Sequence, residues 1–220
     1  MKNLVLSSLC FLFLSGCSFS LLKNFQRLPE AGDPGNELTP WFQGDSNPVY
    51  KTAIDVYRNH FSGLMVIKPL SDNSHRVLFI TELGIKIWDM EFFSNGDFTL
   101  HYCLEALNRR SIINTLKNDI GLMIQNIPEK GKRIKVFSDR RTGQTIIRQK
   151  SGLGSMYYYR GKDAKKVGSI IQTSATGKKV NLRFYSAEEN LIDSVRISHY
   201  KIKLDIYLTA LHENKPAVSE

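Results

Sequence analysis

Between residues 49 and 208, short runs of alternating apolar and polar residues are separated by turn-forming residues. An alternation with a period of two is that of a β-strand with one buried face. It is clearest where Val180, Leu182 and Phe184 alternate with polar or charged neighbours. Because such runs joined by short turns form antiparallel sheets, the pattern predicts a mainly β fold.

The turns and one change of face divide this region into strands. Asn95-Gly96-Asp97 is a strong hairpin-turn sequence, and Thr176-Gly177 is a second turn. Residues 191–208 contain no Gly, Pro or turn cluster, but their apolar face switches near residues 198–201. We therefore interpret 191–208 as one long strand with a β-bulge, which swaps the faces and bends the strand. The other predicted strands are 61–68, 75–81, 85–91, 98–103, 133–138, 144–149, 155–161, 166–174 and 178–186.

One segment in the middle of the chain has a helical period. Ile112, Leu116, Ile120 and Met123 are spaced by four, four and three residues, which places them on one helix face. The pattern predicts a helix over 109–125 that begins at a cap formed by Asn108 or Ser111. Because its apolar residues form a single stripe, this helix packs one face against the sheet. The predicted class is therefore mainly β (α+β).

The N-terminus resembles a bacterial lipoprotein signal. Lys2 precedes an apolar run of about eleven residues, which is too short for the ~20 residues of a bilayer-spanning helix. The run ends in Leu14-Ser15-Gly16-Cys17, which resembles the lipobox. The resemblance implies cleavage between Gly16 and Cys17 and acylation of the Cys17 sulfur, which anchors the chain to membrane lipid. The alternative is an ordinary signal peptide with a cysteine at this position by chance.

These features divide the chain into four parts. We assign residues 1–16 to the signal peptide, 17–48 to a lipidated N-terminus and tether, 49–212 to the β domain and 213–220 to a flexible tail. Trp41 and Phe42 in the tether suggest a second point of docking on the domain. Cleavage leaves Cys103 as the one cysteine that does not carry lipid, so we expect no disulfide within the chain.

The net charge of +9 is unevenly distributed. Residues 129–203 contain eighteen Lys or Arg and six Asp or Glu, whereas residues 18–128 contain ten and twelve. An exported lipoprotein meets anionic head groups and lipopolysaccharide, so no nucleic-acid partner is expected. The alternative is that the basic residues occupy the outward face of the sheet.

The sequence carries no motif for catalysis, a metal or a cofactor. Metalloprotease, phosphate-loop and nucleophile-elbow patterns are absent, and the five His residues are isolated from one another. Asp89 and Glu91 share one face of a predicted strand, where a solvated sheet surface is a better interpretation than an acid–base pair. We therefore expect a protein that is not an enzyme and has no cofactor.

The order of elements resembles the lipoprotein-carrier family of LolA and LolB. The lipobox and tether are followed by the strands of "FSGLMVIKP…HRVLFITELGIKIWDME", one helix and further strands, so that residues 50–208 are covered. The resemblance implies a curved, unclosed antiparallel β-barrel with a helix packed on its concave side. It also implies a concave apolar face that holds acyl chains.

The alternation offers candidates for the lining of such an acyl cavity, although the sequence does not decide which face of each strand points inward. Whether these residues line a cavity or fill a solid core stays open at this point. The candidates are Leu64, Val66, Leu78, Ile80, Ile85, Ile87, Ile147, Tyr157, Tyr159, Leu182 and Phe184.

The family resemblance also implies a membrane-contact residue on a loop between strands. Leu83 in "TELGIK" matches it by position, and a half-buried turn leucine is the alternative. The leading hypothesis is an outer-membrane lipoprotein that faces the periplasm, binds acyl chains and passes lipid or lipoprotein to the membrane. Ser18 after Cys17 is consistent with delivery to the outer membrane. The second hypothesis is a non-catalytic module that docks an envelope protein, and the third is an envelope hydrolase.

Overall fold

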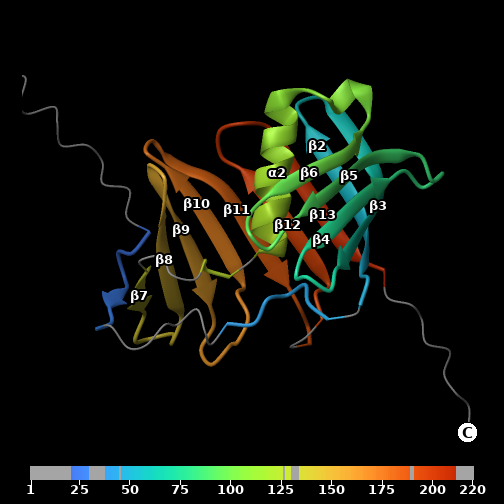
Figure 1. Cartoon of the computed structure of the whole chain (residues 1–220). Helices are drawn as coiled ribbons and strands as arrows, with labels where there is room; N and C mark the ends of the chain where they lie inside the picture. Colours follow the sequence, from blue (N-terminus) through green and yellow to red (C-terminus); the bar gives the residue numbers. More distant parts are fainter. Residues whose placement is uncertain are drawn as a thin grey trace, which may run out of the picture.

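A computed structural model describes residues 21–29, 38–44, 46–125, 127–129, 134–188 and 191–211. These residues form a single antiparallel sheet of thirteen strands, together with one α-helix and one short 3-10 helix (Figure 1). The strands are β1 (Gln26–Arg27), β2 (Val49–Val56), β3 (Asn59–Pro69), β4 (His75–Ile80), β5 (Lys86–Phe92), β6 (Phe98–Cys103), β7 (Ile134–Ser138), β8 (Thr145–Ser151), β9 (Gly154–Arg160), β10 (Ser169–Ser174), β11 (Gly177–Tyr185), β12 (Ser194–His199) and β13 (Leu204–Ala210). The helices are η2 (Glu105–Leu107) and α2 (Arg110–Ile124).

The sheet is curved and does not close. Its strand order is β1-β7-β8-β9-β10-β11-β12-β13-β2-β3-β4-β5-β6, so β1 and β6 are the two outer strands. The sheet wraps around α2, which lies on the concave side between β10–β13 and β4–β6 (Figure 1). The predicted class, a curved and unclosed antiparallel barrel with a helix on its concave side, is confirmed.

The core lies between α2 and the concave face of the sheet. The helix contributes its predicted stripe, in which Leu116, Ile120 and Met123 are buried. Each such side chain stabilises the fold by about 1.5–3 kcal/mol relative to exposure. Buried sheet residues in the same cluster include Tyr50, Ile54, Met65, Ile67, Val77, Phe79, Trp88, Met90, Val180, Leu182, Ile197 and Ile206.

The helix begins and ends within one residue of the predicted positions, but its start differs from the prediction. Arg109 is the N-cap, with an extended backbone and no capping hydrogen bond from its side chain. The predicted caps at Asn108 or Ser111 are therefore wrong. Because the stripe of α2 is buried against the sheet, the helix does not depend on a side-chain cap.

The prediction of one long strand over 191–208 is also wrong. The segment forms two antiparallel strands, β12 and β13, with Ser198 paired to Asp205. Residues 200–203 form the turn, although they contain no Gly, Pro, Asn or Asp. The change of apolar face therefore marks a reversal of the chain and not a bulge.

Antiparallel pairing places the turns on two opposite rims of the sheet. One rim carries the turns β8–β9, β10–β11, β12–β13, β2–β3 and β4–β5, and we call it the basic rim. The opposite rim carries the turns β7–β8, β9–β10, β11–β12, β3–β4 and β5–β6, and we call it the capped rim.

Residues 38–44, within the predicted tether, cross the capped rim (Figure 1, light blue). The Thr39 N–H donates to Lys165 O at 2.9 Å, and Trp41 Nε1 donates to Val167 O at 2.7 Å. His75 Nε2 bonds Phe42 O at 2.8 Å, and the Phe42 side chain is only 3% exposed. This segment therefore closes one rim of the core, which agrees with the docking point expected at Trp41 and Phe42.

Candidate functional site

A cleft of about 1050 Å³ lies on the concave side, between α2 and the strands β8–β10. The sheet wall includes Gln149, Met156, Tyr158 and Gln172. These residues share a face because Gln149 and Gln172 are both register partners of Met156, and Tyr158 lies two residues further along β9. The helix wall includes Lys117, Asn118, Gly121 and Leu122, and the capped rim contributes Phe42, Leu70 and His75.

The amide side chains in the cleft are bonded to other parts of the protein. Asn118 and Gln172 exchange two hydrogen bonds of 3.1 and 3.0 Å, which tie α2 to β10. Gln149 Nε2 donates to Glu129 O at 2.9 Å, and Gln149 Oε1 accepts from the Glu129 N–H at 3.3 Å. The Asn118, Gln149 and Gln172 side chains are therefore bonded within the protein, and the cleft presents a mixed surface of polar and apolar side chains.

Tyr158 is the largest buried side chain of the sheet wall. Burial raises its pKa far above the ordinary value for tyrosine, with a smaller contribution from Glu129. Its hydroxyl lies 3.6 Å from Met156 Sδ. The phenol therefore stays neutral and, with Met156, forms an apolar part of the wall.

A second polar contact joins α2 to β12. His199 Nε2 lies 2.8 Å from Asp119 Oδ2, and both side chains are almost fully buried. Among the described residues, no hydrogen bond links His199 to a Ser, Thr or Cys side chain that could serve as a nucleophile. The pair therefore joins α2 to β12.

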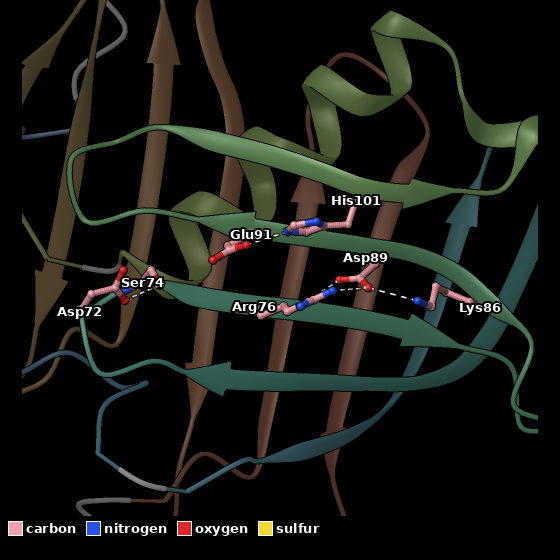
Figure 2. Close-up of polar contacts among 7 residues, drawn as sticks. All are labelled: Asp72, Ser74, Arg76, Lys86, Asp89, Glu91 and His101. Carbon is pink, nitrogen blue, oxygen red and sulfur yellow. Dashed lines mark hydrogen bonds and ion pairs between the residues drawn. The ribbon is translucent and has the colours of Figure 1, made fainter.

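Carboxylates of β5 lie on the convex side of the sheet in an ion-pair network (Figure 2). Asp89 is bonded by Arg76 Nε at 2.8 Å, Arg76 Nη2 at 3.0 Å and Lys86 Nζ at 3.2 Å. The Arg76 hydrogen bonds hold the pKa of Asp89 below its usual range. Glu91 Oε2 lies 2.6 Å from His101 Nε2. Each carboxylate has its own partner, which suits a sheet surface rather than an acid–base pair.

The described residues contain no group of three or more His, Cys, Asp or Glu side chains placed to hold a metal ion. In the same ranges, no helix has the length and apolarity needed to cross a bilayer.

None of the eleven residues predicted to line an acyl cavity lies in the wall of the 1050 Å³ cleft. On β3 and β4, Leu64, Val66, Leu78 and Ile80 alternate with the core residues, so they lie half-buried on the convex face. The inward residues of these two strands are Met65, Ile67, Val77 and Phe79.

The other predicted lining residues divide into three groups. Ile87, Ile147, Leu182 and Phe184 are brought together in the solid core. Tyr157 and Tyr159 flank Tyr158 in β9 and therefore lie on the opposite face, where they are half-buried. Ile85 is 58% exposed in the β4–β5 turn. The residues that line the cleft were missed, although Met156 and Tyr158 alternate with Tyr157 and Tyr159.

Leu83, the predicted membrane-contact residue, lies in the β4–β5 turn and is 89% exposed. Its contact with a membrane stays a prediction. Gly16 and Cys17 lie outside the described residues, so cleavage and lipidation also stay predictions. Cys103 is half-buried at the end of β6, and burial raises its thiol pKa.

No protein-family model and no curated protein matches the chain. Solved structures of similar outline include a domain named as an outer membrane lipoprotein-sorting protein from Vibrio parahaemolyticus. It has a TM-score of 0.48 and 7% identity, and the match covers 85% of this chain and 91% of that one. A LolA superfamily protein from Nitrosomonas europaea has a TM-score of 0.47 and 8% identity, with 81% and 88% covered.

A DUF1329 family protein from Desulfovibrio piger is also similar, with a TM-score of 0.42, 7% identity, and 79% and 88% covered.

Proposed function

We propose that this chain is a membrane-anchored, non-catalytic domain that binds acyl chains in the cleft between α2 and β8–β10. The observation that carries the proposal is the cleft itself, whose volume of about 1050 Å³ is at the upper end of the usual range for ligand pockets. Met156 supplies apolar surface beside the buried Tyr158 and Leu122, while Asn118, Gln149 and Gln172 are bonded within the protein.

The cleft also suits a ligand with a charged head. Lys117 is exposed on the helix wall, and His75 lies in the wall at the capped rim. An acyl chain that contacts Met156 and Tyr158 could place a carboxylate or phosphate near these side chains. A free fatty acid or a phospholipid therefore fits the cleft better than a plain hydrocarbon.

The membrane anchor in this proposal is Cys17, acylated after cleavage behind Gly16. Ser18 directs the lipoprotein to the outer membrane, and the domain faces the periplasm. Exposed Leu83 contacts the bilayer when lipid or lipoprotein is passed on.

Native mass spectrometry of residues 18–220, purified from bacteria without detergent, tests the proposal. We expect added mass that organic solvent removes and that is identified as phospholipid or fatty acid. Met156→Trp narrows the cleft and should abolish most of this added mass. Tyr157→Trp, one residue away on the opposite face, should retain it. A clean mass that is unchanged after mixing with phospholipid vesicles contradicts the proposal.

One observation favours a second function, the docking of an envelope protein. Leu64, Val66, Leu78 and Ile80 form a half-buried apolar stripe on the convex face, outside the cleft. Such a stripe is typical of an interaction surface. Under this function the purified domain carries no lipid, and a substitution such as Val66→Asp disrupts a partner contact without affecting the cleft.

A further inference from the structure

Three neighbouring turns of the basic rim form one continuous surface. The Tyr57 N–H in the β2–β3 turn donates to Lys203 O at 2.8 Å, which joins that turn to β12–β13. The Tyr200 N–H donates to Lys179 O at 3.1 Å, and Lys201 Nζ bonds Thr176 Oγ1, which joins β12–β13 to β10–β11. The three turns are therefore held together by hydrogen bonds.

This surface is strongly basic, and we call it the rim patch. It is made by Arg58, Lys178, Lys179, Lys201 and Lys203 together with Tyr57, Tyr200 and Ile202. Lys178 Nζ lies 5.3 Å from the centre of the Tyr200 ring, so the rim patch contains a cation–π contact.

The acids beside the rim patch have partners of their own. Asp55 Oδ1 is bonded to His60 Nδ1 at 2.6 Å. Asp205 Oδ1 lies 3.9 Å from Arg196 Nη2. The five cations of the rim patch thus outnumber the two nearby carboxylates, and the surface keeps a positive potential that favours an anionic partner.

The rim patch also exposes apolar groups. Tyr57 is 68% exposed, and Tyr200 and Ile202 are exposed beside it. Along the same rim lie Leu83 and Leu153, of which Leu153 at the β8–β9 turn is 90% exposed. Tyrosine is enriched at membrane–water interfaces. Aliphatic side chains at the tips of turns can be buried in a bilayer, whereas the charged backbone of a nucleic acid offers them no apolar surface.

A hollow of about 400 Å³ lies between the rim patch and the flank of α2. Its walls include Lys201 of the β12–β13 turn, Ser174 of β10, Lys179 of β11 and Asn114 of α2.

We propose that the rim patch docks on an anionic phospholipid bilayer. Its Lys and Arg side chains contact head-group phosphates, and Tyr57, Ile202 and the leucine tips enter the head-group region. The proposal does not depend on acyl binding in the cleft, because the rim patch and the cleft share no residue. It extends the bilayer contact proposed above for Leu83. Docking through the rim patch gives the domain a defined orientation on the membrane.

The test is vesicle flotation of the full chain, with phosphatidylcholine vesicles and with mixed phosphatidylcholine–phosphatidylglycerol vesicles. A basic residue near an anionic surface contributes about fivefold in partitioning, so Lys201→Gln/Lys203→Gln should weaken binding to mixed vesicles by about 25-fold. The matched control Arg140→Gln/Arg141→Gln removes the same charge from the exposed β7–β8 turn of the capped rim, and its binding should change less than about twofold. All the proteins compared carry Cys17→Ser, so that an acylated N-terminus does not hold every variant on the vesicles.

Three results overturn the proposal. The first is equal binding by the rim-patch variant and the wild-type chain, and the second is an equal loss of binding in the control variant, with circular dichroism showing that all are folded. The third is failure to bind mixed vesicles while a single-stranded oligonucleotide binds through Lys201 and Lys203, which would identify a nucleic-acid surface. Ile202→Ser serves as an independent variant, since it should weaken the part of the binding that persists at high salt.

Discussion

Both rims of the sheet consist of connections between neighbouring antiparallel strands, but within the described ranges only one of them is covered by another segment of the chain. At the capped rim, residues 38–44 cross the strand ends and bury Leu38 and Phe42 in the core. At the basic rim, Tyr57, Leu83 and Leu153 point into solvent. Apolar residues at the first rim therefore serve the stability of the fold, whereas those at the second are available to a partner.

The largest effect should come from opening the capped rim. Phe42→Ala removes a buried aromatic side chain and should lower the free energy of unfolding by about 3–5 kcal/mol. Tyr57→Ala, the matched change at the basic rim, should shift it by no more than about 0.5 kcal/mol. Urea unfolding of the two variants measures both values. Equal losses would show that the rims do not differ in this way.

A smaller effect should follow from removing one hydrogen bond of the capped rim. Trp41→Phe deletes the Nε1 donor to Val167 O but keeps an aromatic ring beside Phe184. Because Val167 O is left without that donor, we expect a loss of about 1–2 kcal/mol in thermal or urea unfolding. Tyr200→Phe at the basic rim deletes an exposed hydroxyl and should be neutral. A neutral Trp41→Phe would mean that water replaces the lost donor.

The smallest effect concerns the dependence of the unfolding free energy on acid pH. The pKa of Asp72 in the β3–β4 turn is lowered by hydrogen bonds from the Ser74 hydroxyl and N–H, and that of Asp139 in the β7–β8 turn by the Arg141 N–H. Because both folded pKa values lie below the unfolded one, their stabilisation is complete above about pH 4 and is lost as the pH falls through the folded values.

Asp72→Asn/Asp139→Asn should therefore narrow the difference in unfolding free energy between about pH 7 and about pH 3. In this variant Asp89, which is bonded to Arg76, still contributes a stabilisation that is lost at acid pH. An unchanged difference would place the acid sensitivity of the fold away from the capped rim.

Periodicity alone predicted nine strands, β3 to β11, and the helix. It did not resolve β12 from β13, because the turn at Tyr200–Lys203 uses none of the residues that usually mark turns. The rim patch could not be found for the same reason. Four of its eight residues, at 200–203, lie in the segment interpreted as one strand, and the other four are distant from them in sequence.

The residues that line the cleft could not be predicted from the sequence for a different reason. In β3, Leu64, Met65, Val66 and Ile67 are all apolar, so the sequence does not show which face points inward. Gln149 and Gln172 look like surface residues in sequence, yet both lie on the concave face. Their partners across the cleft are set by the packing of α2, which no local pattern encodes.

The two polar contacts of α2 determine how the cleft can respond to a ligand. Asn118 is tied to Gln172 and Asp119 to His199, so adjacent residues of the helix are fixed to two different strands. Sliding or rotating α2 would break both contacts and leave buried polar groups without partners, at a cost of about 1–3 kcal/mol each. The two contacts therefore hold the helix wall of the cleft in one position relative to β10 and β12.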